Sequence, residues 1–187
     1  MKYFLGFLGI VALVIFVFVL VIRGFSHSPN TPKTTQTQLT DYANTSTVMR
    51  MATEGPVAAN QTYGEVRITV GRDANTIEII KGYQGQILKA KTLPNNSDAY
   101  GNFLRALQLL NYTKGNSAPN LADERGYCPD GNRYVYEIVS GAADVQRYWA
   151  GSCGGGTFKG NSAEIRKLFT RQIPDYASFV SNLNINY

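Results

Sequence analysis

The residues with the clearest chemical potential are two cysteines and a glycine-rich stretch around the second of them. Cys128 and Cys153 are the two cysteines of the chain, and RYWAGSCGGGTFKGN covers residues 147–161. A phosphate-binding P-loop needs G-x-x-x-x-G-K-[ST], but here Lys159 precedes Gly160, and the spacing of a dinucleotide-binding loop is also absent. We interpret the glycines as a sharp turn into a helix, whose free N–H groups could still hold an anion.

The two cysteines flank a predicted hairpin. With a turn centred on Ser140 and Gly141, opposing residues have numbers that sum to about 281, which pairs position 128 with 153. A zinc site needs about four ligands, and the single histidine is His27. A redox pair more often has the spacing C-x-x-C, and a papain-like nucleophile needs a histidine nearby. We predict a disulfide, with free thiols as the alternative, and neither a metal nor a cofactor.

Acidic residues near the first cysteine are the remaining candidates for catalysis. Asp123, Glu124 and Asp130 could support glycosidase-type hydrolysis if two carboxyl groups lay about 5–10 Å apart in a cleft. Acidic side chains in a turn-rich loop are more commonly solvated. We therefore predict a protein without catalytic residues, and a carboxylate-based hydrolase is an alternative.

Aromatic residues lie on both strands of the predicted hairpin, and strand alternation divides them between the two faces of a sheet. We assign Tyr134, Tyr136 and Trp149 to the core and Tyr148 to the outer face. Exposed aromatic residues beside a glycine loop are typical of a contact surface for a protein or a glycan. The residues predicted for this surface are Tyr148, Trp149, Gly154, Gly155, Gly156 and Lys159.

The elements that must position these residues follow from hydrophobic periodicity. Alternation and β-branched residues predict strands, whereas apolar spacing of three and four with capping residues predicts helices. The order argues for an α+β fold, an antiparallel sheet with two or three helices packed on one face. The predicted strands are 65–71, 76–81, 86–92, 133–139 and 145–150, with a further hairpin near Gly55 and Pro56 within 47–60; the helices are 96–114, 161–173 and 175–183.

The N-terminal segment predicts a membrane anchor. Residues 4–22, FLGFLGIVALVIFVFVLVI, carry no charge and no proline, and as a helix they would cover roughly 28 Å, close to the hydrocarbon thickness of a bilayer. A cleaved signal peptide has a shorter apolar region and a small-residue cleavage site, and the second is missing here. We divide the chain into a transmembrane anchor (1–23), a flexible Ser/Thr/Asn/Pro-rich stalk (24–47) and an α+β domain (48–187).

Charge and cysteine usage bear on partners and location. The chain has 18 Lys and Arg against 13 Asp and Glu, a net charge of +5, but the basic residues are scattered, which argues against nucleic acid. Charges flanking the apolar segment are nearly balanced, so they do not set the orientation. Because persistent disulfides belong to oxidising compartments, we expect a single-pass protein of the cell membrane with a cytoplasmic N-terminus and an extracytoplasmic C-terminal domain.

Several segments resemble known groups of proteins. VRITVGRDANTIEIIKGYQG, NNSDAYGNFLRALQLLNYTKG and CPDGNRYVYE…RYWAGSCGGGTFKGN…IRKLFTRQIPDY are similar to uncharacterised small single-pass extracytoplasmic proteins of bacteria with reduced genomes. The order of elements also resembles that of emfourin-like peptidase inhibitors. We expect a membrane-anchored domain that binds an extracytoplasmic protein or glycan. The resemblance implies a peptidase inhibitor as the alternative but, because it rests on element order, it assigns no inhibitory residue; our own candidates for the contact are residues 154–159 or 82–85.

Overall fold

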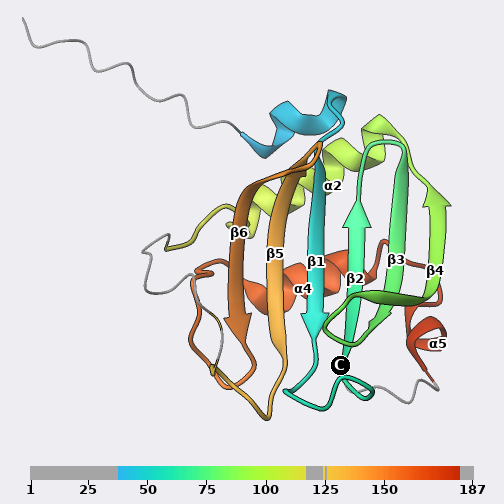
Figure 1. Cartoon of the computed structure of the whole chain (residues 1–187). Coiled ribbons are helices and arrows are strands. Elements are labelled where there is room, and N and C mark those ends of the chain that lie inside the picture. The colour runs from blue at the N-terminus through green and yellow to red at the C-terminus, as the bar shows by residue number, and fades with distance from the viewer. Residues whose placement is uncertain (1–37, 117–123, 125, 182–187) are drawn as a thin grey trace, which may run out of the picture. The chain divides into compact units, whose positions relative to one another are not determined.

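The structure is a computed structural model that describes residues 38–116, 124 and 126–181. These residues form the predicted α+β fold with an antiparallel sheet, and the sheet has six strands (Figure 1). In chain order the elements are η1 (Leu39–Asn44), β1 (Val48–Glu54), β2 (Gly64–Val70), β3 (Ala74–Lys81), β4 (Gln86–Pro94), α2 (Ser97–Leu109), β5 (Arg133–Ser140), β6 (Ala143–Gly151), α4 (Ser162–Thr170) and α5 (Tyr176–Val180).

The predicted transmembrane anchor and the first part of the predicted stalk, residues 1–37, lie outside the described residues. Within the described part of the chain, the structure contains no helix with the length and apolar character needed to cross a membrane.

The sheet has the strand order β4-β3-β2-β1-β5-β6. Strands β1 to β4 form a meander, and the β5–β6 hairpin pairs with β1 on its other side. The hairpin predicted within 47–60 is wrong in its second half, because β1 pairs with β2 and not with 57–60. Residue Val57 instead donates its N–H to the carbonyl of Pro129, 2.7 Å away, in a loop.

Strand alternation places the main core on one face of the sheet. In Figure 1, α2 and α4 cross behind the strands. Burial of a large apolar side chain contributes about 1.5–3 kcal/mol, so this face supplies most of the driving force for folding. Its fully buried residues include Met49, Met51, Val66, Ile68, Ile77, Ile79 and Tyr136 from the sheet, and Tyr100, Leu104, Leu107, Ile165 and Phe169 from the helices.

Both longer helices begin at the predicted asparagines. The side chain of Asn96 accepts a hydrogen bond from the N–H of Ala99 (2.9 Å), and Asn161 does the same for Glu164 (3.2 Å). Asn161 and Glu164 have the spacing of a capping box, but the reciprocal bond from the Asn161 N–H to the Glu164 side chain does not form. The Asn161 N–H donates to the carbonyl of Leu110, and the Glu164 carboxylate pairs with Lys167 instead.

The folded domain begins earlier than the predicted boundary at residue 48. Leu39 is buried in the main core, with Tyr42 packed against it, from the short helix η1. The prediction of a flexible stalk is therefore wrong for residues 38–47. Two apolar residues three apart in a polar segment are enough to dock one helical turn, because they lie on the same side of it.

The β5–β6 hairpin has a different register from the predicted one. Its turn is formed by Gly141 and Ala142, so Arg133 lies opposite Gly151 rather than Tyr148. Gly141 adopts the left-handed conformation (φ 62°) that such a tight turn needs. The offset is an odd number of residues, and this reverses which face of the sheet each side chain occupies.

Candidate binding surface at the loop end of the sheet

One end of the sheet gathers the connections that are richest in unusual residues. Residues 55–63 join β1 to β2, residues 82–85 join β3 to β4, residues 126–132 lead into β5, and residues 152–156 follow β6. Because the strands are antiparallel, all four segments lie at the same end of the sheet, which is the lower end in Figure 1. We call these four segments the loop end.

Hydrogen bonds tie the loop-end segments to one another. The Tyr83 hydroxyl donates to the carbonyl of Ala58 (3.0 Å) and accepts from its N–H (3.2 Å), and the N–H of Tyr83 donates to Asn60 Oδ1 (2.8 Å). The Tyr83 ring stacks on Tyr63 with a centroid distance of 4.1 Å. These contacts cross-brace segments that are far apart in sequence, so the loop end is organised before any partner arrives.

Large apolar side chains are exposed at this end. Val57 is 58% exposed, Tyr83 55% and Tyr127 43%, and the first residues of β4 continue the series with Ile87 at 54% and Leu88 at 44%. Single exposed apolar residues are common, but a concentration of them on braced loops is typical of an interaction site.

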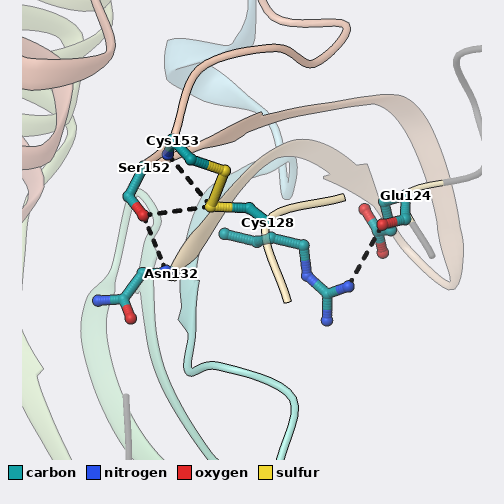
Figure 2. Close-up of a disulfide and its surroundings, with 6 residues drawn as sticks. Glu124, Cys128, Asn132, Ser152 and Cys153 are labelled. Carbon is teal, nitrogen blue, oxygen red and sulfur yellow. Dashed lines mark hydrogen bonds between the residues drawn. A yellow bond between two sulfur atoms is a disulfide. The ribbon is translucent and has the colours of Figure 1, made fainter. Parts of the chain in front are cut away.

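The predicted disulfide between Cys128 and Cys153 is confirmed, with a Cα–Cα distance of 5.8 Å. It joins residues 126–132 to residues 152–156. Figure 2 shows Ser152 and Asn132 beside it: the Ser152 hydroxyl accepts from the Asn132 N–H at 3.0 Å, and the Cys153 N–H donates to Cys128 Sγ at 3.1 Å. An open hollow of about 400 Å³ adjoins the disulfide and is lined by Cys128, Pro129, Asp130, Gly131, Ser152 and Cys153.

The sheet face opposite the helices is covered by ion pairs. Its arginines lie beside half-buried glutamates, so their charges are compensated locally rather than presented to a ligand. The pairs are Arg50–Glu137 (3.3 Å), Arg67–Glu65 (2.8 Å), Arg67–Glu78 (3.7 Å), Arg133–Glu54 (2.9 Å), Arg147–Glu124 (2.8 Å) and Arg147–Glu137 (3.2 Å).

Two of these glutamates, Glu54 and Glu65, face each other across β1 and β2 at the loop end. Burial raises the pKa of Glu54 above its ordinary value, and the negative charges of Glu124 and Glu65 add to this effect. Burial also raises the pKa of Glu65, while the guanidinium of Arg67 opposes the change. The neighbouring Tyr63 has a raised pKa for the same main reason, burial.

The predicted face assignment of the aromatic residues is wrong for Trp149 and Tyr148. Trp149 is 1% exposed and lies on the face away from the helices, in a small cluster with Ala52 and Val135. The ring of Tyr127 lies against it with a centroid distance of 5.1 Å. Tyr148 is half-buried against the main core on the helix side. Trp149 is thus a buried support beneath the loop end and has almost no surface of its own.

The predicted glycine contact surface is divided by the structure. Gly154 and Gly155 are exposed at the loop end, whereas Gly156 is buried and pairs with Ala150 beside β6. The exposed Lys159 follows three buried residues, and its backbone N–H donates to the carbonyl of Lys114. Residues 156–158 therefore form packed structure, and only the first part of the loop remains available for contact.

The acidic residues considered for hydrolysis have separate surroundings. The Glu124 carboxylate is ion-paired with Arg147, and Asp130 lines the hollow beside the disulfide. Asp123 lies outside the described residues. Among the residues that the structure describes, no group of three or more histidines, cysteines, aspartates or glutamates has the geometry of a metal site.

The sequence reading missed the residues that organise the loop end, Tyr63, Tyr83, Tyr127, Glu54 and Glu65. The one local signal was a tyrosine inside the tight turn Gly82-Tyr-Gln-Gly85, a position where an aromatic side chain has no core of its own to enter. Comparison of the chain with protein-family models, with curated proteins and with solved structures gave no match.

Proposed function

We propose that this chain is a membrane-anchored protein whose domain lies outside the cytoplasm and binds a protein or glycan partner through the loop end. The observation that carries the proposal is that the exposed side chains of Val57, Tyr83 and Tyr127 lie on loop-end segments that hydrogen bonds and the disulfide join in series. Loops that are already ordered lose little conformational entropy on binding, so their contact energy is available for affinity.

The chemistry of this surface suits a neutral contact. Tyrosine offers a flat apolar ring with a polar tip, which suits both protein surfaces and sugar rings. The arginines of the adjoining sheet face are neutralised by their own glutamates. The partner is therefore expected to gain its affinity from aromatic and apolar contact more than from long-range charge.

Site-specific photo-crosslinking in native host cells tests the surface. A photoreactive phenylalanine analogue is placed at Tyr127 or Val57, and in the control at Leu109, which is 78% exposed on α2. We expect covalent adducts of one size from positions 57 and 127 and none from position 109. Adducts of equal yield from all positions, or none at 57 and 127, would contradict the proposal.

Thiol labelling in intact cells tests the location. The only cysteines are those of the disulfide, and the proposed domain lies in an oxidising compartment. A membrane-impermeant maleimide should label the chain only after treatment with an impermeant reductant. Labelling without reduction would argue against the disulfide in cells, and labelling only after lysis would place the domain inside.

A peptidase inhibitor is the second candidate, and one observation favours it. The turn at residues 82–85 projects an exposed Tyr83 from a backbone held by hydrogen bonds to Asn60 and Ala58. A rigid exposed turn is what a protease can bind tightly without cleaving rapidly. Assay of the purified chain against a panel of secreted proteases would test it, with Tyr83→Ala as the matched variant; unchanged rates throughout would reject this role.

A further inference from the structure

Strand β4 is an outer edge of the sheet with one side of its backbone free. It pairs with β3 alone, and among the described residues no strand pairs with its other side, although α5 lies near its lower part and contacts Lys89 (Figure 1). The opposite edge differs, because Gly156 pairs with Ala150 of β6. Most residues of β4 are exposed, including Ile87 and Leu88. An exposed edge of this length offers a row of N–H and C=O groups to another strand.

The edge carries features that oppose pairing with a copy of itself. Lys89 and Lys91 lie on it, Pro94 ends it, and the register with β3 shifts between Ile79 and Ile80. Such lysines, prolines and bulges are the usual protection of edge strands against self-association. Two β4 strands side by side would bring like charges together, whereas a strand with acidic side chains meets no such barrier.

Within the part of the chain that the structure describes, the lysines on and beside this edge have no acidic partner. No ion pair joins Lys81, Lys89 or Lys91 to a carboxylate within the described part of the chain, in contrast to the arginines of the ion-paired face. Lys89 Nζ donates to the carbonyl of Phe179 (3.0 Å) and lies 4.1 Å from the centre of its ring, which fixes the position of its charge.

Strand alternation puts these three charges on a single side. Lys91 is opposite Ile77 and Lys89 is opposite Ile79, both of which point into the helix-side core, and Lys81 follows Ile79 in the same alternation. Ile87, opposite the outward-facing Ile80, lies on the other side of the sheet. An incoming strand would therefore meet positive charge on one of its faces and an apolar side chain on the other.

We propose that an acidic extended segment of a partner protein adds to the sheet as a strand beside β4. Its acidic residues occupy alternate positions next to Lys89 and Lys91, and its apolar residues lie on the side of Ile87. This inference rests on the proposed binding role and adds a second contact to it, since β4 begins at the turn that carries Tyr83.

Peptide binding to the full chain in detergent tests the inference. The probe is fluorescein-labelled Thr-Val-Glu-Val-Glu-Val-Thr, and the charge control has Lys in place of Glu. We expect the acidic peptide to bind about tenfold more tightly than the basic one. A third peptide, N-methylated at its three central residues, keeps the charges but cannot donate backbone hydrogen bonds, and it should not bind.

Variants of the chain locate the contact. Lys89→Glu with Lys91→Glu should reverse the preference between the two peptides. The control Lys114→Glu with Arg171→Glu, at two exposed positions away from β4, should leave it unchanged. Lys91→Glu alone keeps the Lys89–Phe179 contact and should weaken the acidic peptide about threefold. Hydrogen exchange of the β4 amides should slow when the acidic peptide is bound.

The outcomes separate this inference from the proposed function. Strand addition would be overturned if the N-methylated peptide still binds, or if the acidic peptide binds the wild-type chain and both β4 variants equally. It would also be overturned if the acidic peptide does not bind at all. The inference would also be overturned if the chain self-associates in the absence of peptide and Lys91→Glu changes this self-association, because the strand beside β4 would then belong to a second copy of the chain. If photo-crosslinking at Tyr127 and Val57 succeeds while the peptide fails, the loop-end function stands and the edge contact falls.

Discussion

At the scale of single residues, Glu54 and Glu65 are the most informative pair. They are opposite one another on adjacent strands, Glu65 buried and Glu54 half-buried, and each is in contact with an arginine, Glu54 with Arg133 and Glu65 with Arg67. Like charges directly opposite on a sheet are unfavourable. Burial, the negative charge of Glu124 and, to a smaller extent, that of Glu65 raise the pKa of Glu54, so the folded state binds a proton there more readily than the unfolded state.

The sign of the resulting pH dependence follows from proton linkage. Between the ordinary pKa of a glutamate and the raised pKa of Glu54, the folded state holds more protons, so its stabilisation falls as pH rises through that window. Glu54→Gln cannot titrate. We predict that the free energy of unfolding of Glu54→Gln, relative to wild type, increases from pH 5 to pH 7.

Fluorescence offers a direct measurement of this effect. Trp149 is the single tryptophan and is buried in the domain, so denaturant titrations at both pH values can be followed by its emission. The lowered pKa values of Asp73 and Glu164 give the opposite pH dependence of stability. This contribution is the same in wild type and in Glu54→Gln, so it cancels when their free energies of unfolding are compared. A difference that stays constant or decreases with pH would contradict the assignment.

At the scale of elements, the sequence was informative about strands and helices and weak about their register. Alternating apolar residues identified β2, β3, β4, β5 and β6, and asparagine caps identified the starts of α2 and α4, because these signals are local. The face occupied by Trp149 depended on where the β5–β6 turn is centred. An odd offset in that turn reversed the face, and no local signal could correct it.

The candidate site lay further beyond the reach of the sequence. Glu54, Glu65 and Arg133 come together only because β1 pairs with both β2 and β5, and that arrangement depends on contacts between distant segments. The disulfide was predictable because cysteine spacing relative to a hairpin is informative even when the register is approximate. The docking of Leu39 was missed because a single leucine in a polar segment is a weak signal.

Gly156 tests the packed part of the glycine loop. A Cβ at this position would collide with the Trp149 carbonyl oxygen and lie 2.8 Å from the Ala150 Cα, and its φ of 109° is unfavourable for other residues. We predict that Gly156→Ala costs about 3 kcal/mol or more, from backbone strain together with overpacking. Gly154→Ala, with φ 89° but no atom within 4 Å, should cost about 1 kcal/mol, from strain alone.

Urea denaturation followed by Trp149 emission would measure both glycine variants. The comparison is matched because both positions have positive φ and belong to the same loop. Equal destabilisation would mean that strain explains everything and that the close approach of Gly156 to β6 has no energetic role.

The helix η1 is tested through its one buried residue. Leu39 is 2% exposed within the main core, and truncation of a buried leucine to alanine costs about 2–5 kcal/mol. Leu109→Ala on α2 is the control, because this leucine is 78% exposed and should change stability by less than about 0.5 kcal/mol. If Leu39→Ala resembled its control in thermal denaturation, residues 38–47 would not belong to the folded domain.

At the scale of the whole molecule, the domain contains what it needs to stay folded by itself. The pattern of contacts within the chain divides it into two compact units, Met1–Thr37 and Gln38–Tyr187. The second unit contains the sheet, the helices, the disulfide and the ion-paired face. The helices cover one face of the sheet, and ion pairs with the Trp149 cluster cover much of the other. Removal of the N-terminal unit should therefore leave the fold intact.

Controlled cleavage between the two units tests the proposed anchor together with the independence of the domain. Residues 30–36 are replaced by the recognition sequence of a site-specific viral protease, and membranes containing the chain are treated with it. We predict that the uncut chain sediments with the membranes, because residues 4–22 are long and apolar enough to span a bilayer. The cut domain should appear in the supernatant with unchanged Trp149 emission and an intact disulfide.

An uncut chain in the soluble fraction would remove the anchor from the proposal. A cut domain that stays with the membrane would instead indicate that the loop end or the β4 edge is already bound to a partner there, and a salt wash or the acidic peptide should then decide which of the two surfaces holds it.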